Sequence, residues 1–283
     1  MDASNESDTL FLAIRFGHTD QLREMLAANP ALASAPLGGR YQTRAPLDIV
    51  TDWPGYFPNG PEIVRLLVAA GADPDGEHPD GRSPGDETPL HWAASSDDVD
   101  VAEALIDAGA DIEAPDGSIG TPLDNAIGYC CWNVARLLVA RGAKVDKLWH
   151  AAALGMLDRL QQLLDGQPTA DEISQAFWHA CSGAQRRAAE LLLGRGADLG
   201  WVPDYAYGTP LDAAMGDGTR RENVITWLRE QGAETASDRD MRAIAIRIET
   251  AFANRDLEAF GTLLAEDARW GDDDAVNKCR SRA

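Results

Sequence analysis

Histidine and cysteine are the residue types in this chain that could support metal binding or nucleophilic chemistry. His150, His179 and Cys181 are candidate zinc ligands. Neither HExxH nor CxxC spacing is present, so the sequence predicts no metal site. Cys130 or Cys181 as a nucleophile would need a paired base, which the sequence does not show. Cys130 and Cys131 are adjacent, which suits neither a normal disulfide nor a metal clip. We therefore expect no catalytic residues and no cofactor.

A frame of about 33 residues organises the chain instead. It opens with Thr-Pro-Leu-His at residues 88–91 and returns as Thr-Pro-Leu-Asp at residues 121–124. Thr88 can cap the free amides of a helix, and Pro89 suits the first helical turn, where its missing N–H is harmless. Gly109 supplies the positive φ that ends a helix at low cost. The frame thus predicts a pair of short helices.

This period and its Thr-Pro-Leu-His-x-Ala opening resemble the ankyrin-repeat family. The resemblance covers residues 8–236 and implies an all-α fold, a solenoid of about seven helix-turn-helix repeats, with residues 1–236 as its domain. It also implies that His91 hydrogen-bonds the loop of a neighbouring repeat. One helix pair cannot bury its apolar stripe alone, so each repeat needs stacked neighbours. The predicted repeats span residues 8–30, 45–74, 88–111, 121–145, 148–166, 171–198 and 209–233.

Two insertions interrupt the repeats. The first, Asp52 to Pro61, carries Trp53, Tyr56 and Phe57 among prolines and glycines that exclude a continuous helix. Such loops often emerge on the binding face of an array. The alternative is that these aromatic side chains fold back as a plug on the neighbouring repeat. The second insertion, residues 75–86, is expected to form a long finger loop.

A ladder of aromatic residues follows adjacent repeats, and in three repeats a tryptophan and a histidine stand side by side at the expected start of the first helix. Aromatic side chains are enriched at interface hot spots, because they bury a large area with few rotatable bonds. Tryptophan also fills cores, so packing within the array is the alternative. With the insertion loop included, the candidate partner-binding residues are Trp53, Tyr56, Phe57, Trp92, Tyr129, Trp132, Trp149, His150, Trp178 and His179.

The C-terminal segment, residues 237–283, has a different pattern. Residues 238–265 predict two amphipathic helices broken near Asn254, and the phrase AFANRDLEAFGTLLAEDARW at residues 251–270 resembles the start of SnoaL-like, or nuclear-transport-factor-like, domains. That resemblance implies a cone of curved sheet that binds or converts a small molecule. The segment is too short for a complete cone, so we expect either part of a longer protein or a helical cap on the array.

Composition narrows the partner class. The chain of 283 residues has 46 acidic and 25 basic residues and a net charge of −21. This charge argues against nucleic acid and anionic membranes and suits a basic protein partner, although it also fits solvated helix faces. No signal peptide or long apolar run is present. The unpaired cysteine spacing indicates a reduced cytoplasm, and the richness in Ala, Arg, Gly and Asp is typical of bacteria. The sequence thus predicts a non-catalytic protein–protein interaction module and no particular oligomeric state.

Overall fold

The computed structural model describes residues 3–38, 43–76, 87–115, 117–216, 222–256, 262–263, 269–270 and 279–280. Within these residues seven helix pairs follow one another, which confirms the predicted all-α solenoid. The first helices of the pairs are α1 (Ala3–Arg15), α3 (Pro46–Thr51), α5 (Pro89–Ser95), α7 (Pro122–Gly128), α9 (Leu148–Ala153), α11 (Ala170–Ser182) and α13 (Pro210–Met215). The second helices are α2 (Thr19–Ala28), α4 (Gly60–Ala69), α6 (Val99–Asp107), α8 (Trp132–Ala140), α10 (Leu157–Leu164), α12 (Arg186–Leu193) and α14 (Glu222–Glu230).

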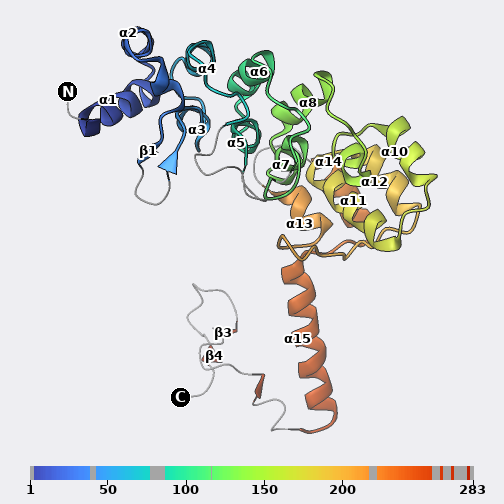
Figure 1. The fold of residues 1–283 in the computed structure, drawn as a ribbon. Helices are drawn as coiled ribbons and strands as arrows, with labels where there is room; N and C mark the ends of the chain where they lie inside the picture. The colour runs from blue at the N-terminus through green and yellow to red at the C-terminus, as the bar shows by residue number, and fades with distance from the viewer. Residues whose placement is uncertain are drawn as a thin grey trace.

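The helices stack in two layers. From α1 to α13, each first helix contacts the first helix of the next repeat, and second helices contact one another in the same way from α2 to α8 (Figure 1).

The remaining elements are small. A 3-10 helix, η1 (Pro30–Ser34), precedes an antiparallel pair of β1 (Leu37–Gly38) and β2 (Thr43–Arg44), and β3 (Arg269–Trp270) pairs antiparallel with β4 (Cys279–Arg280). Most of the predicted finger loop, at residues 77–86, lies outside the described residues.

The Thr-Pro-Leu openings start helices as predicted. The side-chain oxygens of Thr88, Thr121 and Thr209 accept hydrogen bonds from the amides three residues later, at 3.3, 3.4 and 3.4 Å. Each satisfies one of the free amides at a helix start, with proline in the first turn. Gly109, just after α6, has a φ of 99°, which confirms its predicted role in ending that helix.

The core runs between the two layers and is built from two clusters of buried side chains. The first extends from Leu10 to Ala153 and the second from Ala151 to Ala233. Trp149 packs against both clusters and so joins them. Between repeats, the fully buried His91 places Nε2 2.9 Å from the carbonyl oxygen of Gly120, in the loop before α7. This contact confirms the predicted link from His91 to a neighbouring repeat.

Helix α15 (Ala236–Ala253) follows the last repeat and projects away from the stacked pairs (Figure 1). Thr235 caps its first turn, and it ends before Asn254, where the sequence predicts a break. Met241 and Phe252 on this helix are each 64% exposed. The second helix predicted in this segment lies mostly outside the described residues.

Candidate functional site

A pocket of about 630 Å³ opens on the side of the first helices. Its walls come from α7, α9 and α11 and from the loops that precede α7 and α13, so three consecutive repeats and a fourth loop are needed to form it. Four of the candidate residues proposed from the sequence share this pocket. The lining residues are Ser118, Ile119, Gly128, Tyr129, Lys147, Trp149, Gln175, Trp178, His179, Tyr205 and Ala206.

One wall of the pocket is a stack of rings from successive repeats. The His179 ring lies 4.7 Å from Trp149 on one side and 6.2 Å from Tyr205 on the other, with interplanar angles of 31° and 23°. Trp178 meets His179 edge-on at 5.1 Å. We call Trp149, Trp178, His179 and Tyr205 the aromatic wall. Edge-to-face and offset arrangements of this kind are the favoured ones for aromatic pairs.

Hydrogen bonds hold the aromatic wall in place. Gln175 Nε2 donates to the Tyr205 hydroxyl oxygen at 3.2 Å, and that hydroxyl lies 3.1 Å from His179 Nε2. Trp178 Nε1 donates to the carbonyl of Gly208 at 3.1 Å. Burial, together with the nearby His150, lowers the pKa of His179 to about 3, so its ring is neutral at physiological pH and can accept the Tyr205 proton.

Behind the pocket lies a buried carboxylate, Asp124, whose side chain is 1% exposed. Its Oδ1 accepts from Lys147 Nζ at 2.6 Å and contacts His150 Nε2 at 2.7 Å, and its Oδ2 accepts from the Thr121 amide at 2.7 Å. Burial alone would raise the pKa of Asp124, but hydrogen bonds from His150, Lys147 and Thr121 outweigh it and hold the pKa well below 3.8. Asp124 is therefore ionised and fixes the position of Lys147.

His150 is placed inside the array rather than on its binding side. It is 1% exposed and its ring packs edge-on against Trp149 at 4.3 Å. The expected position of the Trp178–His179 pair at a helix start is wrong, because Thr169 caps α11 and the pair lies in the second half of that helix. His179 is also buried, at 4% exposed, and reaches the pocket only through one edge of its ring.

Two ladder residues lie away from the pocket. Trp92 is half-buried with the Arg44 guanidinium 5.2 Å from its ring, and Trp132 packs against the core at the start of α8. Trp132 lies on a second helix and is not among the residues that line the pocket. The predicted ladder therefore divides into two groups. Tyr129, Trp149 and Trp178 line the pocket, whereas Trp92 and Trp132 pack elsewhere on the array.

The middle of the insertion loop contacts a neighbouring repeat on each side. The Tyr56 amide donates to Asp98 Oδ2 at 2.5 Å and its hydroxyl donates to the carbonyl of Asp97. Phe57 lies beneath the Arg15 guanidinium, 3.9 Å from the ring centroid. These contacts fit the plug interpretation for two of the three aromatic residues. Trp53, which is 73% exposed, is the loop residue most available to a partner.

Tyr205 is a lining residue that the sequence analysis missed. It lies in the stretch WVPDYAYG between the sixth and seventh repeats, where three aromatic residues in a loop were a signal of a functional surface. The loop is outside the repeat frame, so aligning the repeats could not place it.

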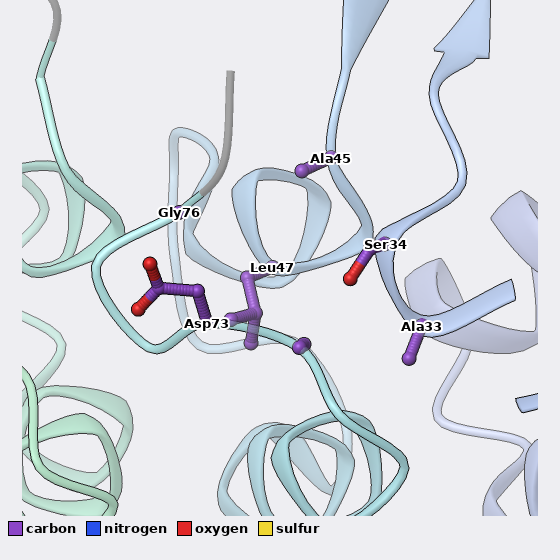
Figure 2. A pocket seen from close by; sticks show the side chains of 7 residues that line it. Ala33, Ser34, Ala45, Leu47, Asp73 and Gly76 are labelled. Carbon is purple, nitrogen blue, oxygen red and sulfur yellow. The ribbon is translucent and has the colours of Figure 1, made fainter. Parts of the chain in front are cut away.

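The described residues hold no group of three or more His, Cys, Asp or Glu side chains arranged to bind a metal ion. Cys131 and Cys181 are buried, and burial raises the pKa of the Cys131 thiol to about 12, which makes it a poor nucleophile. A second crevice, between η1 and the start of α3, measures only about 10 Å³ (Figure 2). It has room for at most one water molecule.

Stacked helix pairs, in which the first helices α5, α7 and α13 start at a threonine cap and a proline, form an all-α solenoid with the architecture of ankyrin repeats. Residues 55–147 match the family model for ankyrin repeats (3 copies). Ankyrin repeats are protein-interaction modules and are generally not catalytic. In the described part of the chain, no helix has the length and apolar character needed to cross a membrane.

One curated protein and one solved structure are also similar to this chain. The human transient receptor potential cation channel subfamily A member 1 is 42% identical over 60 residues, which is 21% of this chain and 5% of that protein. This chain thus spans only a small fraction of that relative's length. The crystal structure of the human ASB11 ankyrin repeat domain covers 77% of this chain and 96% of its own, at 17% identity and a TM-score of 0.46.

Proposed function

We propose that this chain binds a protein partner through the pocket of α7, α9 and α11, without catalysis. The observation that carries the proposal is the exposure of aromatic rings there. Tyr129 and Tyr205 are 54% and 56% exposed, beside the half-buried Trp149 and Trp178. Large rings left open around a pocket are typical of interface hot spots. The array is already folded, so little conformational entropy is lost on binding.

Charge and the insertion loop extend this surface. The net charge of −21 would speed association with a basic partner and would lose that effect as salt rises. Trp53 supplies a further exposed ring, on a loop anchored between α1 and α6. We place the interaction in the cytoplasm, which the free thiols of Cys130, Cys131 and Cys181 favour.

The resemblance of residues 237–283 to a SnoaL-like domain stays a prediction, as does the division of the chain at residue 236. The family match lies within residues 55–147, and the described structure after residue 236 is mainly helix α15. A small-molecule function for that segment is therefore the alternative.

The test is affinity capture from native lysate with the tagged chain, quantified by mass spectrometry. A Tyr129→Ala, Trp178→Ala double variant removes two rings from the pocket, and Trp132→Ala is the matched control because it removes a ring outside it. Circular dichroism confirms that each variant folds. The proposal expects a protein that wild type and the control capture and the double variant loses. Equal capture by all three folded proteins would refute it.

A further inference from the structure

The pocket has one charged lining residue, Lys147, among aromatic, apolar and neutral polar side chains. Its ammonium Nζ lies 5.6 Å from the centre of the Trp149 ring, and its side chain is 43% exposed. The ammonium carries three N–H donors, of which the hydrogen bond to Asp124 uses one. Asp124 also accepts bonds from Thr121 and contacts His150, so it does not belong to Lys147 alone.

The aromatic wall offers ring faces rather than free hydrogen-bonding groups. Trp178 Nε1, the Tyr205 hydroxyl and His179 Nε2 all have partners within the protein. A flat ring can therefore cover this wall without leaving those polar groups unpaired. The volume of about 630 Å³ falls within the range of small-molecule sites, roughly 300–1,000 Å³.

The two ends of the pocket differ in charge. Partial burial raises the pKa of the Tyr205 phenol, a bond from Gln175 opposes that rise, and the negative charges of Asp204 and Asp171 add to it. The Tyr205 end is thus electronegative. At the other end the Lys147 ammonium is on the pocket side and its counter-ion Asp124 is buried, so that end is the one where an anionic group can pair.

We propose that this pocket is a binding site for a small planar aromatic carboxylate. The ring lies against the exposed parts of Trp149, Trp178 and Tyr205, and the carboxylate accepts a charge-assisted hydrogen bond from Lys147. This site goes beyond binding of a protein partner. It also means that a basic partner is attracted by the overall charge of the chain and not by the pocket itself.

The experiment is isothermal titration calorimetry of the full chain with three probes that share one ring. These are indole-3-propionate, the neutral indole-3-propionamide and the cationic tryptamine. We expect one saturable site for indole-3-propionate with a Kd of roughly 1 mM or below. Its affinity should exceed that of the amide by about fivefold, as for a half-exposed ion pair, and tryptamine should bind most weakly.

Variants locate the site. Lys147→Met should lower the affinity for indole-3-propionate to that for the amide and leave the amide unchanged. Lys144→Met is the matched control, because Lys144 is 72% exposed and pairs with Glu113 away from the pocket. Tyr129→Ala should weaken all three probes. The comparison of probes on wild type stands even if Lys147→Met does not fold.

Three results would overturn the proposal: no binding of indole-3-propionate, equal affinity for the three probes, or tightest binding of tryptamine. Stronger binding of N-acetyl-tryptophanamide than of indole-3-propionate would also overturn it, and would indicate a pocket shaped for a side chain on a peptide. The first three results leave the protein-capture proposal standing, because capture is tested on Tyr129 and Trp178 rather than on Lys147, so the two proposals can fail separately.

Discussion

Replacing Asp124 with asparagine should destabilise the array through loss of an acceptor, not through a change of shape. The carboxylate uses Oδ1 for Lys147 and His150 and Oδ2 for Thr121. An asparagine amide has only one acceptor oxygen. Its NH₂ group is a donor, so it cannot accept the bonds made to the other carboxylate oxygen. Suppose that the amide oxygen stays with Thr121. Loss of the ion pair with the half-exposed Lys147 then lowers the stability by about 0–1 kcal/mol, and loss of the acceptor for the buried His150 nitrogen lowers it by about 1–3 kcal/mol. The expected total loss of stability is about 1–4 kcal/mol.

Asp212 provides the matched control, because it fills the same place in the seventh repeat. Its Oδ2 accepts from the Thr209 amide, the Thr209 hydroxyl and the Ala236 amide. A single amide oxygen can take over all three bonds, so Asp212→Asn should cost less than about 1 kcal/mol. The difference between the two variants isolates the Lys147 and His150 contacts from the helix cap.

Urea unfolding followed by circular dichroism measures both losses, with amide hydrogen exchange of α7 and α9 as a local readout, since repeat arrays can unfold in blocks. The pKa of folded Asp124 is lowered from 3.8. Its stabilising effect is therefore fully present above about pH 4 and is lost as the pH falls further. The difference in the free energy of unfolding between wild type and Asp124→Asn should become smaller as the pH is lowered from 6 to 3. A gap that is constant with pH, or no larger than that of Asp212→Asn, would refute the reasoning.

Gly17→Ala should destabilise the chain by about 2 kcal/mol, because its φ is 71° and an added Cβ would lie 2.3 Å from a backbone oxygen of the insertion loop. Gly71→Ala, with φ 110° and open space, should lose only about 1 kcal/mol in the same urea assay. Brief alkylation at pH 8 followed by peptide mass spectrometry should label the exposed Cys130 well before Cys131, whose pKa burial raises to about 12. Between pH 6.5 and 4.5, His179 should show no NMR titration. In this pH range the His179 ring takes up a proton only in the unfolded chain. Lowering the pH should therefore reduce the free energy of unfolding of wild type by up to about 1.4 kcal/mol per pH unit more than that of His179→Gln.

The helix pairs were predictable from sequence because their causes are local. A threonine, a proline and a leucine in order set a cap and a first turn, and Gly109 sets an end, whatever the rest of the chain does. Trp149 and Trp178 were singled out because the frame aligned them, and Tyr129 because it lies near them in sequence, and all three line the pocket.

The remainder of the site depends on contacts between repeats, which a repeat frame does not contain. The sequence suggested His150 as a partner-binding residue. In the structure it contacts Asp124, 26 residues earlier in the chain, and is buried inside the array. Tyr205 reaches the aromatic wall from a loop whose path the frame does not specify. Trp132 has the same residue type as Trp149, but lies on a second helix and does not line the pocket.

The position of Trp149 has a mechanical consequence. This residue packs against both core clusters, and the same ring forms part of the pocket wall. If the ends of the array were pulled apart, the two clusters would give way as separate segments, with Trp149 at the joint between them. A molecule bound in the pocket would stabilise the contact between the two clusters, and the array would become stiffer as a result.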